Sequence, residues 1–138
     1  MNAVFLVARV LFVVLFLFSA LGHLTKADAM AQYAAYKKAP GGKAGVILSG
    51  ITLGVGALMV LLGIYGDIGS LLLAATLVPI TLFMHQYWKE TDEQSKLSEM
   101  TAFNKNTALI GGALAFFLIF AVSAGHLGLT VTGPVDSL

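Results

Sequence analysis

The stretch AGVILSGITLGVGALMVLLGIY, residues 44–65, carries no charged side chain. A helix needs about 20 mostly apolar residues to cross a bilayer core, and this stretch is long enough. Three further stretches are also long and mostly apolar, at residues 3–24, 68–88 and 107–129. Helices are the expected form of all four, because a helix satisfies its own backbone hydrogen bonds in lipid. The sequence therefore predicts an all-α membrane protein, with a single four-helix transmembrane domain over residues 1–138.

The composition excludes several classes of protein. Of the 138 residues, 58% are hydrophobic and only 11% are charged, whereas an average soluble domain is about 25% charged. Mean hydropathy is +0.89. So few charges cannot cover a water-soluble surface, and a net charge of +1 cannot neutralise a run of nucleic-acid phosphates. The chain has no cysteine, which excludes disulfides and thiolate-ligated metals built from this chain alone.

The first apolar stretch has an alternative interpretation as a signal peptide. Arg9 precedes an apolar run over 10–22, and Ala27-Asp28-Ala29 resembles a cleavage site. No positive residue stands ahead of Arg9, however, so the expected structure is a spanning helix.

Lysines indicate how the helices are oriented. The two long linkers, 25–43 and 89–106, hold seven of them: Lys26, Lys37, Lys38, Lys43, Lys89, Lys96 and Lys105. Cytoplasmic loops are enriched in Lys and Arg, so both linkers are predicted to be cytoplasmic and both termini to lie outside. Helical spacing over 30–37 predicts a short interfacial helix between the first two spans. The linker 89–106 is expected to be a polar, solvated loop.

Ionisable residues inside spans are functional candidates, because burying them in lipid is costly. At 100° per residue, Arg9, Ser19 and His23 fall on one side of the first helix, which should face the bundle. Arg9 is expected either to extend to the outer interface or to be a buried cation that binds a quinone oxygen, a carboxylate or a lipid headgroup.

His23 and His85 come at the ends of the first and third spans, which run in the same direction. Both should therefore lie at one membrane face, with Thr81 and Trp88 on the same helical face as His85. The alternatives are two unrelated interfacial histidines, a quinone-like or proton-relay site, and a haem held by both rings, in that order of preference. The acidic residues are expected in loops, turns or the tail. No catalytic set or other metal-ligand motif is found.

Small residues mark the second and fourth spans. Gly50 and Gly54 form a GxxxG that Ala57 extends, and Gly111 and Gly112 stand near the start of the last span. Small side chains let helices approach closely in lipid. These residues predict either packing inside the bundle or a seam with a partner subunit or a second copy. A further residue, Pro79, predicts a kink in the third span.

Three motifs, in order along the chain, resemble the DoxX family of small bacterial membrane proteins. They are RVLFVVLFLFSALGHL at 9–24, the glycine-rich stretch 54–63, and HQYWKETDEQSKLSEMTAFNKNTALIGGAL at 85–114. The resemblance implies a four-helix bundle in the bacterial inner membrane. It also implies a link to membrane redox work, because founding members are associated with a thiosulfate:quinone oxidoreductase and others are described as partners of redox-detoxifying proteins.

Carried over by position, the polar set of that family would be Arg9, His23, His85 and Lys105-Asn106. This sequence departs from the family pattern at two positions that bear on function. Many members have lysine where His23 stands, and many have an acidic residue in the second helix, where this chain offers only Ser49 and Thr52.

The expected function is an accessory subunit or partner of a membrane redox or respiratory complex, not an enzyme on its own. One alternative is a quinone-interacting component of a membrane oxidoreductase, using Arg9, His23 and His85 around a pocket near Pro79. The other is a small carrier or lipid-binding protein. Expected partners are the lipid bilayer and either other membrane subunits or a second copy of the chain. A quinone is a possible cofactor, and haem is not expected.

Overall fold

The computed structural model describes residues 2–123 and 126–135. In this part of the chain the elements are α1 (Asn2–Thr25), α2 (Ala27–Tyr36), α3 (Gly42–Leu62), α4 (Gly66–Met84), the short 3-10 helix η1 (Tyr87–Lys89) and α5 (Glu93–Ser123). Helices α1, α3, α4 and α5 are long and apolar enough to cross a membrane. The predicted all-α, four-span class is confirmed, and α2 is a short helix between the first two spans.

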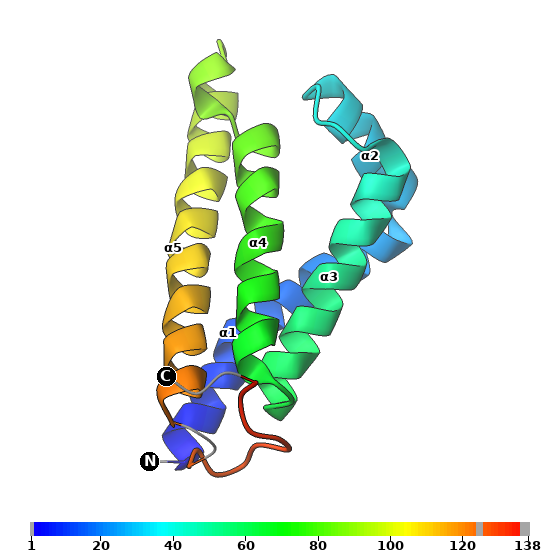
Figure 1. The fold of residues 1–138 in the computed structure, drawn as a ribbon. Coiled ribbons are helices and arrows are strands. Elements are labelled where there is room, and N and C mark those ends of the chain that lie inside the picture. The colour runs from blue at the N-terminus through cyan, green and yellow to red at the C-terminus, as the bar shows by residue number, and fades with distance from the viewer. Residues whose placement is uncertain (1, 124–125, 136–138) are drawn as a thin grey trace.

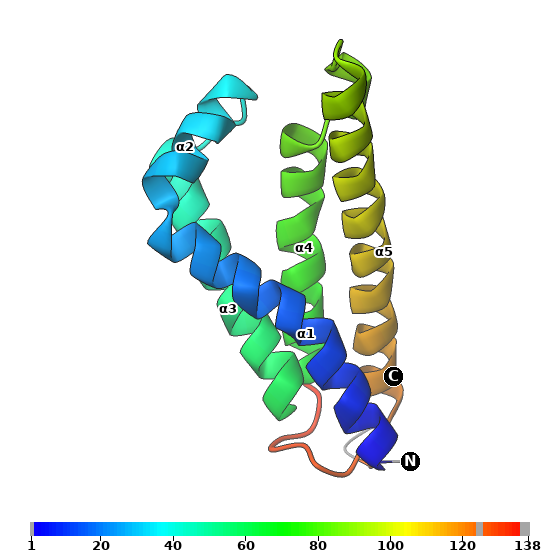
Figure 2. The same ribbon diagram turned by 180° about the vertical axis from the view of Figure 1, so that it is seen from behind.

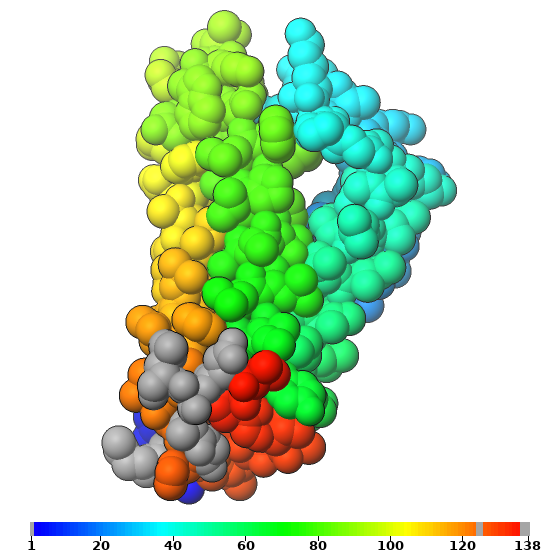
Figure 3. Space-filling model, viewed as in Figure 1, coloured from blue at the N-terminus to red at the C-terminus, as the bar shows by residue number. Residues whose placement is uncertain are grey.

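The four long helices form two pairs. Helix α1 packs against α3 and α4 against α5, and α3 and α4 join the pairs. Figures 1 and 2 show that the pairs lie close together at the end that carries the N-terminus and diverge toward the end that carries α2. We call these the closed end and the open end. In the space-filling view, an opening separates the cyan segment from the green α4 (Figure 3).

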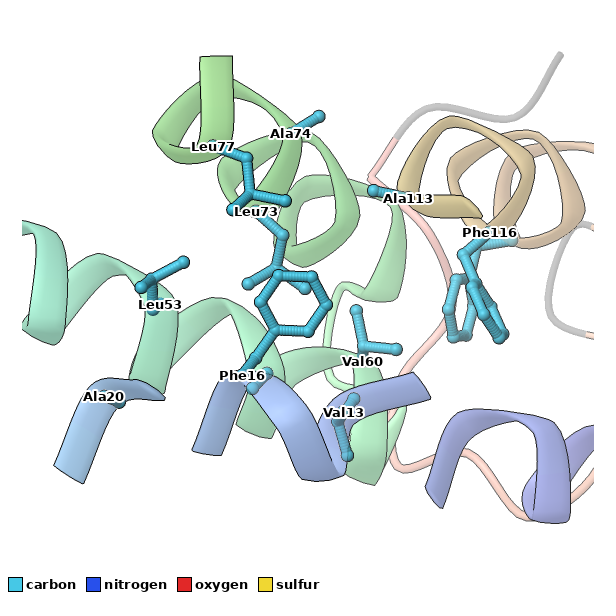
Figure 4. Close-up of a cluster of buried hydrophobic side chains, with 12 residues drawn as sticks. Val13, Phe16, Ala20, Leu53, Val60, Leu73, Ala74, Leu77, Ala113 and Phe116 are labelled. Atoms are coloured by element: carbon cyan, nitrogen blue, oxygen red, sulfur yellow. The ribbon is translucent and has the colours of Figure 1, made fainter. Parts of the chain in front are cut away.

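The apolar core lies where the pairs meet. Figure 4 shows Phe16 of α1 among side chains of α3 and α4. The full cluster is Val13, Phe16, Ala20, Leu53, Ala57, Val60, Leu73, Ala74, Leu77, Ala113, Phe116 and Phe120. The ring of Phe116 on α5 lies 4.7 Å from that of Phe12 and 5.8 Å from that of Phe5 (centroid to centroid), both on α1. Helix α1 is therefore an integral part of the core, as expected of a spanning helix.

The last helix begins much earlier than the sequence analysis predicts. The linker 89–106 is predicted to be a solvated loop, and the loop is wrong, because α5 starts at Glu93; residues 91–98 are exposed. Its start is capped by Asp92, whose carboxylate accepts a hydrogen bond from the Ser95 backbone N–H at 2.9 Å. A helix of 31 residues is about 46 Å long, so its first turns extend beyond a hydrocarbon core about 30 Å thick.

Other predicted boundaries also change. Helix α4 ends at Met84, where the backbone leaves the helical region at His85 (φ −117°, ψ 48°), so His85 and Trp88 do not share a helical face with Thr81. The fourth span ends at Ser123 rather than 129, and residues 124–125 lie outside the described part. The acidic residues are also not confined to loops: Asp28, Asp67, Glu93 and Glu99 all belong to helices.

A segment after α5 closes the bundle at its narrow end. We call residues 126–135 the strap; they run across the turn between α3 and α4 (red in Figure 1). Its Val131 N–H donates to the Leu62 carbonyl at 3.1 Å, and its Thr132 N–H donates to the Gly63 carbonyl at 3.0 Å. The α3–α4 turn is thereby held by a distant part of the chain.

The small residues of α3 lie against α1. A Cβ added at Gly50 would stand 2.7 Å from the His23 Cβ, and one at Gly54 would stand 3.4 Å from the Ala20 Cβ. Ala57 is fully buried in the core. On α5, Gly112 faces the Phe12 ring, whereas a Cβ at Gly111 would meet nothing within 4 Å. Close helix approach inside the bundle thus uses Gly50 and Gly54, and Gly111 is exposed on the outer surface.

We expect Gly50→Ala to lower the free energy of unfolding by about 2 kcal/mol, because the added methyl group overpacks the α1–α3 contact. Gly111→Ala is the matched control, since its methyl group enters open space and alanine is the better helix former. Thermal unfolding in detergent should separate the two variants. Equal melting temperatures for both would contradict the assignment of Gly50 to a tight helix contact.

Candidate functional site

The divergence of the helix pairs leaves a cleft of about 460 Å³ at the open end. This volume lies within the usual range for small-molecule pockets. Helices α2, α3 and α4 and the end of α1 supply its walls. The lining is mainly apolar, and includes Met30, Val46, Leu48, Pro79, Ile80, Phe83 and Met84. A few polar side chains interrupt it: His23, Tyr33, Ser49, Thr52, Thr76 and His85. An apolar cleft with a small number of polar groups suits a lipophilic ligand with a polar head.

His23 is held by the first turns of α3. Its Nδ1 lies 2.7 Å from the Ser49 hydroxyl and 3.3 Å from the Val46 carbonyl. The Ser49 hydroxyl donates its own proton to the Val46 carbonyl at 2.8 Å. Because that proton is already used, we assign the proton of the His23 ring to Nδ1, which donates to Ser49. Nε2 then carries a lone pair and has no protein hydrogen-bond partner in the described ranges, so it is available to a ligand.

His85, from the segment after α4, lines the same cleft. Its Nδ1 lies 2.8 Å from the Glu99 Oε2, and a carboxylate can only accept, so Nδ1 is the donor here too. Its Nε2 makes no hydrogen bond to the residues that the structure describes. The structure therefore brings the two predicted histidines to one cleft, each with Nδ1 fixed and Nε2 unused.

Glu99 is the buried centre of a polar cluster that the sequence analysis missed. It is 8% exposed, accepts a hydrogen bond from the Tyr33 hydroxyl and from His85, and lies 3.4 Å from the Lys37 Nζ. Lys37 also pairs with Glu90. We call Tyr33, Lys37, His85, Glu90 and Glu99 the polar latch. Helix α2 packs mainly on α3 and α1, so the latch ties it across the cleft to the α4–α5 pair.

The latch shifts the pKa values of Tyr33 and Lys37, its two members at the end of α2, outside the membrane spans. Burial and the hydrogen bond to Glu99 both raise the pKa of the Tyr33 hydroxyl above its ordinary value. Burial acts to lower the pKa of Lys37, but the bond to Glu90 and the charge of Glu99 outweigh it and raise that pKa. Near neutral pH, Lys37 is therefore a cation and Tyr33 keeps its proton.

The raised pKa of Tyr33 predicts a loss of stability in alkali. The folded state binds the phenolic proton more tightly than the unfolded state, so this contribution is complete below the ordinary pKa of 10.0 and is lost as the pH rises through the raised value. We expect the free energy of unfolding to fall more steeply above pH 10 in the wild type than in Tyr33→Phe. Denaturant unfolding at pH 8 to 11.5 tests this. Tyr36→Phe, which removes an exposed hydroxyl, should keep the wild-type slope; a wild-type slope in Tyr33→Phe would contradict the prediction.

Arg9 lies at the closed end, away from the cleft, and is 0% exposed. Its Nη2 donates to the Leu129 carbonyl of the strap at 2.7 Å, and its guanidinium stands 5.1 Å from the centroid of the Phe5 ring. Nε and Nη1 have no hydrogen-bond partner among the described residues. Arg9 is thus buried within the protein.

The predicted polar side of α1 is therefore not one site. Arg9 contacts the strap, His23 lines the cleft, and Ser19 is half-buried and lines neither. Thr81 is buried and donates to the Leu77 carbonyl of its own helix at 2.7 Å. Within the described ranges, no group of three or more His, Asp or Glu side chains is placed to hold a metal ion.

The chain matches the family model DoxX over residues 4–86, which is more than half of its length. The chain belongs to the DoxX family. In this DoxX protein the matched part covers α1 to α4 and includes both cleft histidines, whereas α5, with Glu99, lies beyond it. The motif 85–114 is therefore almost wholly outside the match. Comparison with curated proteins and with solved structures found no match.

Proposed function

We propose that this DoxX protein binds a quinone in the cleft between its helix pairs. One observation carries the proposal: His23 and His85, from different helices, line a single apolar cleft and each leaves Nε2 unused. A quinone has a flat apolar ring, two carbonyl oxygens and a lipophilic tail. The lone pair on each Nε2 can accept a hydrogen bond from a quinol hydroxyl, and protonation of the ring lets the same atom donate to a quinone carbonyl oxygen.

The protein then acts as an accessory, quinone-binding component of a redox complex in the bacterial inner membrane, with electrons exchanged by a partner subunit. The family membership supports the link to redox work. The seven lysines in segments 25–43 and 89–106 support placing the open end in the cytoplasm and both termini outside. In this orientation the cleft faces the cytoplasmic leaflet.

The test uses the full chain purified in mild detergent. Organic extraction should recover a quinone, and added short-chain quinone should quench the fluorescence of Trp88 in a saturable way. Trp88 is the sole tryptophan and lies three residues beyond His85. His23→Ala and His85→Ala should each weaken binding about tenfold, the effect of one lost hydrogen bond.

His126→Ala is the matched control, because His126 lies at the closed end and is bonded to the Ser123 carbonyl. It should bind quinone as the wild type does. Extraction that recovers no quinone, together with quenching that does not saturate, would overturn the quinone proposal.

A further inference from the structure

A second hollow, of about 440 Å³, shares Phe83 with the cleft and opens at the same end. We call it the lysine hollow. Lys37, Lys38 and Lys89 line it, and Glu90 is its acidic residue. It is formed by the end of α2 and the segment after α4.

The charges of the lysine hollow do not cancel. Lys37 is paired with Glu90 and Glu99, so Glu90 is already neutralised. Lys38 and Lys89 form no ion pair with the residues that the structure describes. The hollow also offers neutral donors from Tyr36, Gln86 and Thr91. Two free ammonium groups with hydroxyl and amide donors around them are complementary to an anion with several oxygens.

The position of the hollow indicates that this anion belongs to a lipid. Phe83 stands in the last turn of α4, a membrane-spanning helix that ends at Met84. Tyr36 is 74% exposed and Trp88 is 52% exposed beside it, and exposed aromatic side chains gather where headgroups begin. Lipid phosphates lie at this depth, and Phe83 offers an apolar surface directly below.

We propose that the lysine hollow binds the phosphate of an anionic phospholipid, with an acyl chain against Phe83 and the outer face of α4. This site is separate from the quinone cleft. Its occupant is defined by the charge of the hollow and its depth, and it does not depend on the redox role.

The experiment is native mass spectrometry of the full chain in detergent, titrated with dioleoyl phosphatidylglycerol or dioleoyl phosphatidylcholine. Each lysine near an anionic surface contributes about a fivefold factor in binding. The double variant Lys38→Gln/Lys89→Gln should therefore weaken phosphatidylglycerol binding about 25-fold. The matched control is Lys96→Gln/Lys105→Gln, which removes the same charge from α5 outside the hollow and should change binding less than twofold. Lys38→Arg/Lys89→Arg should restore binding.

Three results would overturn the proposal. Equal weakening by both glutamine pairs would show attraction by overall charge rather than a site. Equal affinity for the two lipids would show that anionic charge is not recognised. Displacement of the lipid by millimolar sn-glycerol 3-phosphate would show a site for a free phosphate. Thermal unfolding of the Lys38→Gln/Lys89→Gln variant in detergent, with the melting temperature of the wild type, shows that the variant is folded and keeps this test distinct from that of the cleft.

Discussion

Glu99→Ala is expected to lower the free energy of unfolding by about 3 kcal/mol, because it removes the buried acid that Tyr33, Lys37 and His85 share. The Tyr33 hydroxyl and the His85 Nδ1 lose their acceptor, and Lys37 keeps only Glu90. Glu99→Gln preserves the size of the side chain and an acceptor oxygen, so its loss should be smaller. Denaturant unfolding in detergent measures both variants.

The same substitution should also release α2 from the α4–α5 pair. The chain has no cysteine, so spin labels can be placed at Ala35→Cys and Thr101→Cys, two exposed positions on α2 and α5. We expect the distance distribution between the labels to broaden and shift to longer values in Glu99→Ala. Glu93→Ala is the control, because Glu93 is exposed in the first turn of α5. An unchanged, narrow distribution in Glu99→Ala would show that the latch does not hold the open end.

Gly63→Ala is expected to cost about 3 kcal/mol of stability through two independent effects. Gly63 has φ +64°, a conformation that costs a residue with a side chain about 1 kcal/mol. Its added Cβ would also stand 2.6 Å from the Thr130 side chain and 2.8 Å from the Arg9 Nη1, and such overpacking costs about 2 kcal/mol more. The strap and the buried arginine both need the space that glycine leaves here.

Gly42→Ala separates the two effects. Gly42 also has a positive φ, +55°, but a Cβ there would meet nothing within 4 Å, so this variant should lose only about 1 kcal/mol. Hydrogen exchange gives a second measurement: the Val131 and Thr132 amides, which donate to the α3–α4 turn, should exchange faster in Gly63→Ala and at the wild-type rate in Gly42→Ala. Identical behaviour of the two variants would show that the strap is not packed against Gly63.

The spans were predictable from sequence because hydropathy over about 20 residues depends on composition alone. The placement of His23 and His85 at one end followed from counting helix directions. Arg9 and His23 share a side of α1 but not a site. The angle of 100° per residue tells which side of a helix a residue is on, and not its position along the axis. Fourteen residues separate them by about 21 Å along the axis, so they reach opposite ends of the bundle.

The latch could not be predicted, because its members come from two segments far apart in the sequence, 33–37 and 85–99, and its central acid stands in a stretch of polar composition. That stretch, 89–106, suggests a solvated loop. Two signals could have found the helix: Asp92 as a cap three residues before Ser95, and the strong helix formers that follow. The burial of Glu99 depends on where α2 lies, which no local pattern encodes.

The separation of the helix pairs leaves a sideways opening through the bundle (Figure 3). In a bilayer, hydrocarbon chains fill any apolar space that they can reach, because they pack there as well as leucine does. Binding of a ligand in that space is consequently an exchange reaction, in which acyl chains leave as the ligand enters. The equilibrium constant of this exchange depends on the lipid as well as on the protein. Shorter or more unsaturated acyl chains will therefore alter the apparent affinity for the ligand without any change in the protein.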